Sequence, residues 1–256
     1  EGLKVGIVSR GYGRRKTSKP LLVSHTSNPA DCGDEPILIF EKTGCPIAVH
    51  EKRRTAVELL TTEYVVDLIL SDDGLQHYDL ARDLEIVLID KDRAFGNGHC
   101  IPLGPLREPT ARLRDVDLVL YRGGDGPLSV HYLPGDLKQV GYSKNYRPKS
   151  FPDLSFVHAI AGIGQPEQFF SMLEEMGLNL KRFSYEDHYQ FQQSDFERHE
   201  GQAIVMTEKD AVKCRYLNLA DAWFLEIEVL LPKEVVEAVM KLLKPIEKLN
   251  FERGTA

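Results

Sequence analysis

The sequence predicts an α/β protein built on a mostly parallel β-sheet, followed by a second, smaller α/β unit. Short runs rich in Val, Ile and Leu alternate with longer segments of helical spacing, and Gly, Asp or Ser ends each run. Runs that are apolar throughout, without polar alternation, are typical of parallel strands covered by helices on both faces. Hydrophobic residues make up 42% of the 256 residues, which is enough for real cores.

In the first part of the chain, strands are expected to alternate with helices. The expected strands are residues 3–8, 21–24, 46–50, 65–70, 84–90 and 116–121. The expected helices are residues 34–43 and 52–62, because their apolar side chains fall on single helix faces. This order predicts a sheet whose strands are buried between helices.

A proline-rich stretch at residues 128–149 interrupts this rhythm, and we place a domain boundary near residue 150. Domains are therefore expected at residues 1–150 and 151–256. In the second domain, the expected strands are residues 156–161, 180–185, 203–207 and 223–230, and the expected helices are residues 166–176, 208–213 and 232–243. Pro166 falls at the first position of a helix, where its missing N–H group is harmless.

The composition argues against several classes of protein. The formal charge of −7 disfavours a protein that follows a nucleic-acid backbone, because such proteins carry a basic excess. The four cysteines form no C-x-x-C pair, as expected of reduced thiols in a cytoplasmic protein, and make structural zinc improbable. No run reaches the roughly 18 apolar residues of a membrane-spanning helix, and no signal peptide opens the chain.

Two adjacent carboxylates, Asp72 and Asp73, directly follow a predicted buried strand, and Gln76 and His77 crowd the same turn. In open α/β sheets, ligands bind at the carboxyl ends of the strands. Paired carboxylate oxygens there suit Mg²⁺, which keeps several waters and takes further oxygens from a phosphate group. The alternative is that both aspartates cap a turn around Gly74.

Two further segments carry candidate site residues. One is the start of a predicted helix, and the other follows the first predicted strand. Asp34 is expected at the N-cap of the helix at residues 34–43 and Glu35 in its first turn, where capping and the helix dipole also account for them. Residues 9–15 combine two glycines with three arginines, whose forked donors suit phosphate. The alternative for this segment is a solvated basic loop.

Two later segments also carry candidate chemistry. The long Gly- and Pro-rich loop at residues 95–109 is typical of a lid or binding loop. Asp187 and His188 follow a predicted strand, and His188 is a candidate general base, although a lone histidine is more often simply hydrogen-bonded. The phosphate-binding Walker A pattern G-x-x-x-x-G-K-[ST] does not occur in the 256 residues.

Taken together, these segments resemble the tetraacyldisaccharide 4′-kinase family, the lipid A 4′-kinases, from residue 1 to about residue 243. The segments that carry the resemblance are residues 9–13, 33–36, 72–77, 102–109, 161–166, 187–189 and 207–213. The strings Asp-Asp-Gly-Leu-Gln-His at 72–77 and Thr-Glu-Lys-Asp-Ala at 207–211 are the most specific. Their order along the chain is that of the family.

The resemblance implies an activity, a fold and a location. The activity is transfer of the γ-phosphate of ATP, with Mg²⁺, to the 4′-hydroxyl of a tetraacylated disaccharide 1-phosphate. The implied partners are this acylated lipid, ATP and the cytoplasmic membrane surface, at the cytoplasmic face of the bacterial inner membrane. The implied fold is a P-loop NTPase-like domain with a smaller α/β domain that closes over the active site.

The resemblance also implies roles for individual residues. Asp34 corresponds to the general base, and His188, from the second domain, to the residue that orients it. Asp72, Asp73 and Glu35 correspond to residues that hold Mg²⁺, and Asp73 and His77 are also placed among the residues of the chemical step. The implied substrate-binding residues are Arg10, Tyr12, Gln76, Arg107 and Glu108, and Arg10, Arg14, Arg15 and Lys16 are expected to form a basic patch near the membrane.

One departure from the family pattern is large. Members of the family begin with an apolar anchor, a first strand and a Walker A loop, whereas this sequence opens on what resembles the end of the following helix. We therefore expect poor ATP binding and little turnover from these 256 residues alone. Two alternatives stay open, namely a non-catalytic homologue that binds lipid or a partner, and a metal-dependent phosphohydrolase built on Asp72 and Asp73.

Overall fold

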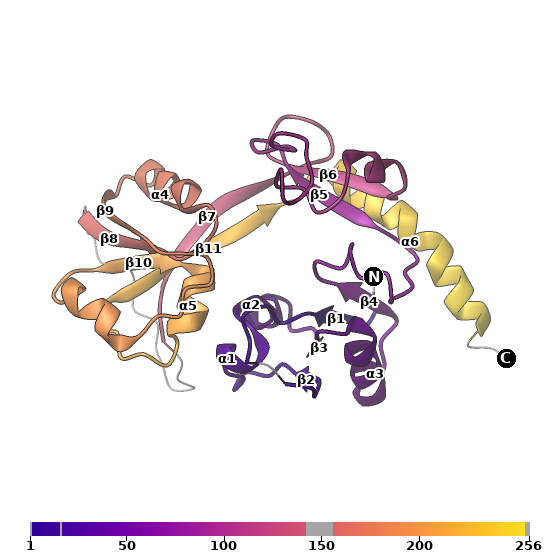
Figure 1. The fold of residues 1–256 in the computed structure, drawn as a ribbon, viewed down its shortest axis with the longest axis horizontal. Coiled ribbons are helices and arrows are strands. Elements are labelled where there is room, and N and C mark those ends of the chain that lie inside the picture. The colour runs from indigo at the N-terminus through magenta and orange to yellow at the C-terminus, as the bar shows by residue number, and fades with distance from the viewer. Residues whose placement is uncertain (1, 16, 142–155, 254–256) are drawn as a thin grey trace. The chain divides into compact units, whose positions relative to one another are not determined.

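The computed structural model describes residues 2–15, 17–141 and 156–253, and for residues 245–253 the backbone alone (Figure 1). The chain divides into two compact units. Unit 1 comprises Glu1–Gly74 and Pro134–Ile227, and unit 2 comprises Leu75–Leu133 and Glu228–Ala256. The domain boundary expected near residue 150 falls outside the described residues, so the division into residues 1–150 and 151–256 stays a prediction.

The first part of unit 1 is a small α/β layer structure around a four-stranded sheet. Its strands are β1 (Val5–Ser9), β2 (Leu21–Leu22), β3 (Ile47–Val49) and β4 (Leu68–Ser71), in the order β2-β3-β1-β4. Strand β1 runs parallel to both β3 and β4, whereas β2 is antiparallel to β3. Three helices accompany the sheet: α1 (Pro29–Cys32), α2 (Asp34–Thr43) and α3 (Arg53–Glu63).

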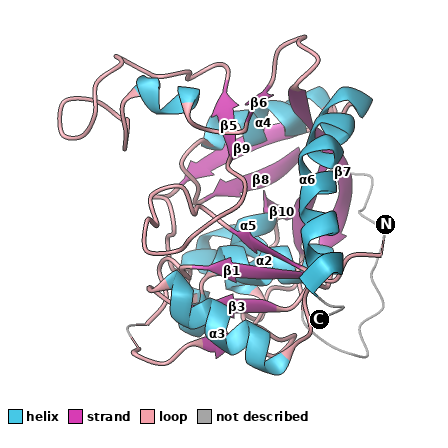
Figure 2. Cartoon of the chain, turned by 90° about the vertical axis from the view of Figure 1, so that its right-hand side faces the viewer, coloured by secondary structure: helices cyan, strands magenta, loops and turns pink. Residues whose placement is uncertain are grey.

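Alternation along these strands divides their side chains between two cores. Ile7 and Ile47 form one core with Ile37 of α2, and Val8 forms the other with Leu60 of α3. Because successive side chains of a strand point to opposite faces, helices α2 and α3 cover opposite faces of the sheet (Figure 2). This part of the chain therefore has the three layers expected of an α/β fold.

The second part of unit 1 contains another parallel sheet. Strands β8 (Phe156–Ala161), β9 (Asn179–Ser184), β10 (Ile204–Thr207) and β11 (Ala222–Leu230) lie in the order β9-β8-β10-β11, with neighbours parallel. Helix α4 (Pro166–Glu175) packs Phe170 and Leu173 against one core, and helix α5 (Glu208–Cys214) packs Ala211 and Cys214 into another. The expected second α/β sheet is therefore present.

Unit 2 contains a shorter parallel sheet and the last helix. Strands β5 (Ile86–Asp90) and β6 (Leu118–Arg122) pair along their full length, and the start of β7 (Ser129–Gln139) extends the sheet beside β6. The long helix α6 (Lys233–Arg253) belongs to this unit, and strands β7 and β11 run from one unit into the other.

The structure corrects two expectations about the strands. The strands of the first part belong to two sheets instead of one, because β5 and β6 pair with β7 and not with β1–β4. Strand β4, expected to be buried, lies at the edge of its sheet, and Leu70 is 49% exposed. The other expected strands and helices occur with ends shifted by a few residues, and α6 extends further than expected, to Arg253.

Strand β7 is the one long element that the sequence did not indicate. It contains Pro134 and Gly135, and exposed and partly buried positions alternate only from Pro134 onward. Proline and glycine are rare inside strands and commonly mark turns, which is why this stretch was read as a break in the pattern.

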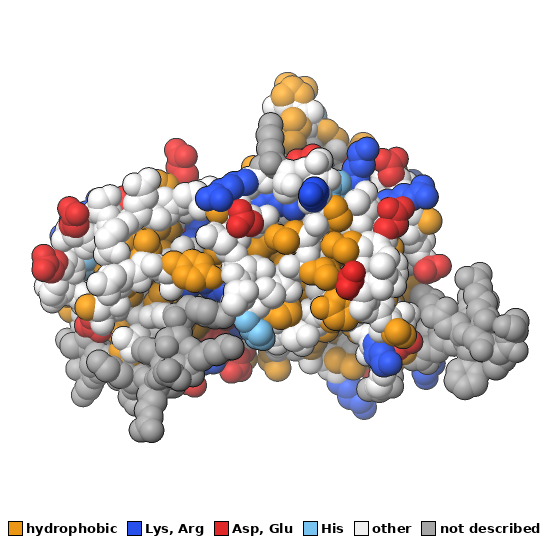
Figure 3. All heavy atoms as spheres, turned by 90° about the horizontal axis from the view of Figure 1, so that it is seen from below, with side chains coloured by type: hydrophobic (Ala, Val, Ile, Leu, Met, Phe, Trp, Pro, Cys, Tyr) orange, Lys and Arg blue, Asp and Glu red, His pale blue; other side chains and the backbone are white. Residues whose placement is uncertain are grey.

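The surface and the helices give two further observations. Figure 3 shows acidic and basic side chains interspersed on the face that it presents. Among the described residues, no helix combines the length and apolar character needed to cross a membrane.

Candidate active site

Asp34 carries a carboxylate oxygen that is buried and unsatisfied. The residue was expected at the N-cap, but Gly33 takes that position, and Asp34 is the first residue of helix α2 and 4% exposed. Its Oδ1 atom accepts a hydrogen bond of 3.0 Å from the backbone N–H of Glu35, but its Oδ2 atom is buried with no hydrogen-bond partner among the described residues. Buried polar atoms are nearly always hydrogen-bonded, so this exception requires an explanation.

A close approach of two backbone segments places Asp34 beside the loop that follows β1. Gly33, just before the helix, has a φ of +93°, and a Cβ atom there would lie 3.0 Å from the carbonyl oxygen of Tyr12. Gly11 has a φ of +68°, and a Cβ atom there would lie 2.6 Å from the carbonyl oxygen of Cys32. Only glycine fits such positions at low strain, so both glycines serve to bring these segments together.

His188 faces the unsatisfied oxygen of Asp34. Its Nδ1 atom lies 3.4 Å from Asp34 Oδ2. The residue follows β9 in a left-handed conformation with a φ of +61°, and its ring packs at a centroid distance of 4.7 Å on Tyr12. Left-handed backbone is uncommon outside glycine and concentrates at functional sites. Asp34 and His188 both belong to unit 1.

Lys209, in the first turn of α5, completes this cluster. Its Nζ atom lies 3.0 Å from Glu35 Oε1, 3.4 Å from Asp187 Oδ1 and 3.4 Å from His188 Nε2. Burial lowers the pKa of Lys209, but the charges of Asp34, Glu35 and Asp187 outweigh burial, so the pKa is raised. Lys209 is therefore held as an ammonium ion.

Helices α2 and α5, which carry these groups, are locked against each other. Figure 1 shows them side by side, and Val212 of α5 joins the core around Ile37 of α2. Glu41 of α2 pairs with Arg215, and Lys42 Nζ lies 3.0 Å from Glu208 Oε2. This packing fixes the helix ends on which Asp34 and Lys209 lie.

A second carboxylate cluster lies at the end of β4. Ser9 Oγ donates a 2.9 Å hydrogen bond to Asp72 Oδ2, and Arg53 donates a 2.7 Å bond to the Asp72 carbonyl oxygen. The pKa of Asp72 is raised, first of all by burial and also by the charges of Glu35 and Asp73. The hydrogen bond from Ser9 and the charge of Arg53 oppose this rise. Glu35, Asp72 and Asp73 therefore interact electrostatically.

The described residues contain no group of three or more His, Cys, Asp or Glu side chains placed to hold a metal ion by themselves. Mg²⁺ does not need such a cage, because it commonly binds through one or two carboxylates, water and phosphate oxygens. The hard oxygen donors of Asp72, Asp73 and Glu35 fit that mode of binding. The aspartates at the end of β4 were expected on these grounds.

Three predicted substrate-binding residues come together in unit 2. Gln76 Nε2 donates a 2.7 Å hydrogen bond to Glu108 Oε1, and Arg107 donates a 3.2 Å bond to Gln76 Oε1. Tyr78 donates a 2.7 Å bond to Glu108 Oε2, and these hydrogen bonds from Tyr78 and Gln76 lower the pKa of Glu108. His77 lies half-buried in the same turn, and its carbonyl oxygen accepts a bond from Leu80.

The structure thus groups the predicted site residues in two sets. In unit 1, one cluster is formed by Asp34, Glu35, His188 and Tyr12. Asp72 and Asp73 interact electrostatically with Glu35 of this cluster. The exposed Arg10 interacts electrostatically with Arg53. In unit 2, Gln76, Arg107 and Glu108 are hydrogen-bonded to one another.

Ser9, Arg53 and Lys209 were not expected as members of the site. Ser9 and Lys209 lie in segments that carry the resemblance, and a lysine in the first turn of a helix also opposes the helix dipole, whereas nothing in the sequence indicated Arg53.

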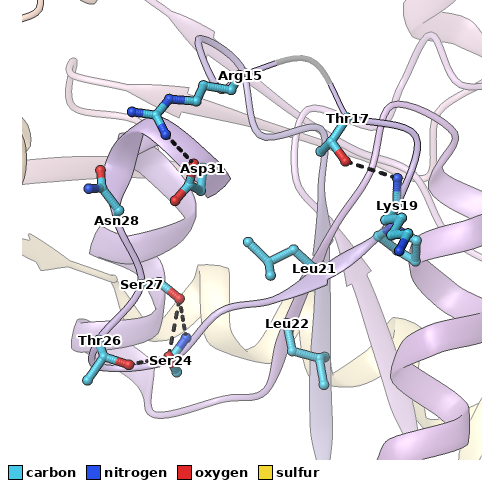
Figure 4. A pocket seen from close by; sticks show the side chains of 11 residues that line it. Arg15, Thr17, Lys19, Leu21, Leu22, Ser24, Thr26, Ser27, Asn28 and Asp31 are labelled. Carbon is cyan, nitrogen blue, oxygen red and sulfur yellow. Dashed lines mark hydrogen bonds and ion pairs between the residues drawn. The ribbon is translucent and has the colours of Figure 1, made fainter.

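Two residues of the expected basic patch, Arg14 and Arg15, make contacts within the protein. Arg14 turns inward and donates a 3.3 Å hydrogen bond to the carbonyl oxygen of Val49, and Lys16 lies outside the described residues. Arg15 pairs at 3.4 Å with Asp31 at the rim of a separate pocket of about 600 Å³ (Figure 4). The pocket is lined by Arg15, Thr17, Lys19, Pro20, Leu21, Leu22, Ser24, Thr26, Ser27, Asn28 and Asp31, and by none of the clustered carboxylates described above.

The fold has a counterpart among solved structures. A crystal structure of LpxK from Aquifex aeolicus in complex with ATP superposes with a TM-score of 0.74 at 28% sequence identity, over 95% of this chain and 79% of that one. The protein is therefore an α/β protein of the P-loop NTPase-like class with mostly parallel sheets, as the sequence predicts.

Sequence comparison then identifies the family. The model of the family described as tetraacyldisaccharide-1-P 4′-kinase matches residues 1–244, and this chain belongs to that family of phosphotransferases. Tetraacyldisaccharide 4′-kinase of Azotobacter vinelandii is 45% identical over 231 residues, which are 89% of this chain and 69% of that protein. The enzyme of the same name from Haemophilus influenzae is 43% identical over 242 residues, 93% of this chain and 71% of that protein. The resemblance is confirmed.

Proposed function

We propose that this protein transfers the γ-phosphate of ATP to the 4′-hydroxyl of a tetraacylated disaccharide 1-phosphate, with Asp34 as the general base. Membership of the family supports the reaction and the substrate, and the ATP complex of the Aquifex aeolicus relative supports the donor. The observation that carries the role of Asp34 is its buried Oδ2 atom, which has no hydrogen-bond partner and faces His188.

The proposed chemistry uses that oxygen as a proton acceptor. Asp34 Oδ2 takes the proton of the 4′-hydroxyl as the hydroxyl oxygen bonds to the γ-phosphorus and the bond to ADP breaks. In phosphoryl transfer the protein contributes mainly positioning and electrostatic stabilisation, together with one group that accepts the proton. His188 holds the carboxylate in place through its Nδ1 side.

Asp72, Asp73 and Glu35 are proposed to hold Mg²⁺, which would neutralise charge on the phosphate oxygens. Asp72 is oriented for this role by the hydroxyl of Ser9 and by the bond from Arg53 to its carbonyl oxygen. The raised pKa of Asp72, caused first by burial, is a property that a bound cation would reverse.

The remaining predicted residues are proposed to hold the sugar and its phosphate. Arg10 and Arg107 are exposed guanidinium groups, which suit a phosphate through forked hydrogen bonds. Tyr12 supports the ring of His188, and the bonded pair of Gln76 and Glu108 offers polar atoms for hydroxyl groups. The acyl chains of the substrate support work at the membrane surface, proposed here as the cytoplasmic face of the inner membrane. His77 is proposed to act with Asp73 beside the reacting groups.

The test is a pair of single substitutions, Asp34→Asn and His188→Gln, in the full-length protein. We expect kcat to fall by roughly 10²–10⁴-fold for Asp34→Asn, with KM for ATP and lipid nearly unchanged. Asp31→Asn is the matched control, because Asp31 is a nearby, more exposed aspartate that pairs with Arg15. A loss confined to KM would overturn the role of Asp34, and phosphate release from simple esters without ATP would favour a hydrolase.

A further inference from the structure

The ammonium group of Lys209 contacts three acceptors at once. These are a carboxylate oxygen of Glu35 on α2, a carboxylate oxygen of Asp187 and the Nε2 atom of His188. An ammonium ion has three N–H donors and no acceptor. A contact between Lys209 and His188 Nε2 is therefore favourable only when that nitrogen offers its lone pair.

This requirement determines where His188 carries its proton. A neutral imidazole has one N–H donor and one acceptor nitrogen. If Nε2 is the acceptor toward Lys209, the proton resides on Nδ1. The Nδ1 atom is the one that faces Asp34 Oδ2, at 3.4 Å. The N–H group then lies on the side of the ring that faces the proposed base, where neither Nδ1 nor Asp34 Oδ2 has another partner among the described residues.

We infer that Lys209 is a positioning residue that fixes His188 in the Nδ1–H tautomer, so that the N–H side of the ring faces Asp34 Oδ2 and keeps that carboxylate aligned. This inference rests on the proposed role of Asp34 and deepens it. Lys209 does not touch the reacting atoms in this scheme, since it acts through the far side of the imidazole ring.

Charged or aromatic groups face His188 from every element that packs against it. The groups that face it are Asp34 from α2, Lys209 from α5, Asp187 from its own loop, and the ring of Tyr12 from the loop after β1. Protonation of Nε2 would place a second N–H donor against the Lys209 ammonium group. The carboxylates of Asp34 and Asp187 favour the imidazolium ion, and Lys209 opposes it.

The position of Lys209 is unfavourable by local rules, which is a second argument for a function. It lies in the first turn of α5, where a positive charge opposes the helix dipole. Violations of local rules that the surrounding structure compensates are expected at functional sites. Here the compensation comes from acids of α2 and of the loop after β9.

The first test is the tautomer itself, read from the imidazole ¹⁵N signals of the whole protein above neutral pH. The signal of His188 is assigned by its disappearance in His188→Gln. We expect the Nδ1–H form to predominate in the wild type. Predominance of the Nε2–H form in the wild type would overturn the inference before any variant of Lys209 is made, and it would leave the proposed reaction unaffected.

Substitutions then separate the donor from the charge. Lys209→Met removes both, so we expect the Nε2–H and imidazolium forms to gain population. Lys209→Gln keeps an N–H donor without charge, so it should retain the Nδ1–H form but allow protonation at higher pH than in the wild type. Lys209→Arg should behave as the wild type. The control is Lys233→Met, which removes an exposed lysine paired with Glu237. An unchanged tautomer in Lys209→Met would refute the inference.

The kinetic test uses the phosphotransfer reaction. For Lys209→Met we expect kcat to fall about 10- to 100-fold, with KM for ATP unchanged and the acid limb of the pH–rate profile displaced to higher pH. Lys209→Arg should recover most of kcat. A drop in kcat with an unchanged pH profile and tautomer would indicate a structural role and overturn the inference. Absence of any phosphotransfer in the wild type would refute the proposed function alone, because the ¹⁵N measurement does not depend on turnover.

Discussion

Helix α5 carries two lysines one helical turn apart, and their environments are opposite. Lys213 Nζ lies 2.5 Å from Asp210 Oδ1, and the two side chains are 1% and 0% exposed. Lys209 keeps 17% of its side chain exposed and is shared among Glu35, Asp187 and His188. Both lysines pair with carboxylates, but Lys209 has more side-chain partners than Lys213 and is more exposed to solvent.

The partners of the buried pair explain the difference. Asp210 Oδ2 accepts bonds from the Gly162 backbone N–H at 2.8 Å and from the Thr207 hydroxyl at 2.6 Å, and Lys213 Nζ also lies 3.4 Å from the Gly162 carbonyl oxygen. These bonds tie the turn after β8 to the start of α5. The Lys213 pair therefore holds the fold, whereas Lys209 and its partners Glu35 and Asp187 keep contact with solvent.

The largest expected effect tests the buried pair. Lys213→Met should lower the free energy of unfolding by about 3–5 kcal/mol, because it leaves the Asp210 carboxylate buried without its counter-charge. Urea unfolding monitored by circular dichroism measures this loss. The double variant Lys213→Met/Asp210→Asn should regain much of it, because asparagine carries no charge and still accepts the Gly162 bond. Equal losses in both variants would contradict this account.

A smaller, pH-dependent effect comes from a buried pair that carries no charge. His158 Nδ1 and His199 Nδ1 lie 2.8 Å apart, which requires one nitrogen to donate and the other to accept. Burial, reinforced by the charges of His158, Arg198 and Lys181, lowers the pKa of His199 from 6.5 to about 4. The unfolded chain then binds a proton more readily than the folded one, so the free energy of unfolding should fall as the pH drops from 6.5 toward 4.

Urea titrations at several pH values in this window measure that dependence. The control is His199→Gln, which removes the titrating group and should flatten the dependence on pH. A free energy of unfolding in the wild type that stays constant or rises between pH 6.5 and 4 would contradict the assignment.

The smallest expected effect tests the open cluster with the substitution already described for Lys209. Lys209→Met should change the free energy of unfolding by about 1 kcal/mol or less, because its carboxylate partners Glu35 and Asp187 are near half exposed and retain access to water. Urea unfolding of Lys209→Met and Lys213→Met under the same conditions compares the two losses in the free energy of unfolding directly. A loss for Lys209→Met as large as that for Lys213→Met would remove the distinction between the two lysines.

Much of the local structure follows from the sequence. The apolar runs predict β8 and most of the other strands, and the acid-rich start and Gly44 at the end delimit α2, which the structure places at Asp34–Thr43. The pattern could not show that β5 and β6 join a different sheet from β1, because strand pairing depends on contacts distant along the chain. Strand β7 was missed because Pro134 outweighs its weak alternation.

For the candidate site too, the sequence indicated some features and the tertiary structure alone showed others. The sequence by itself determined the family, through motifs in a fixed order, and the residue types that carry the chemistry, including Asp34, Asp72 and His188. The tertiary structure alone decided that Asp34 Oδ2 is buried without a partner, that His188 faces it, and that Lys209 lies behind His188. The contact between Asp34 and His188 joins residues more than 150 positions apart, as does the 3.0 Å bond between Glu35 and Lys209. Local propensity and spacing carry no information about such distances, because they arise when helices α2 and α5 pack together.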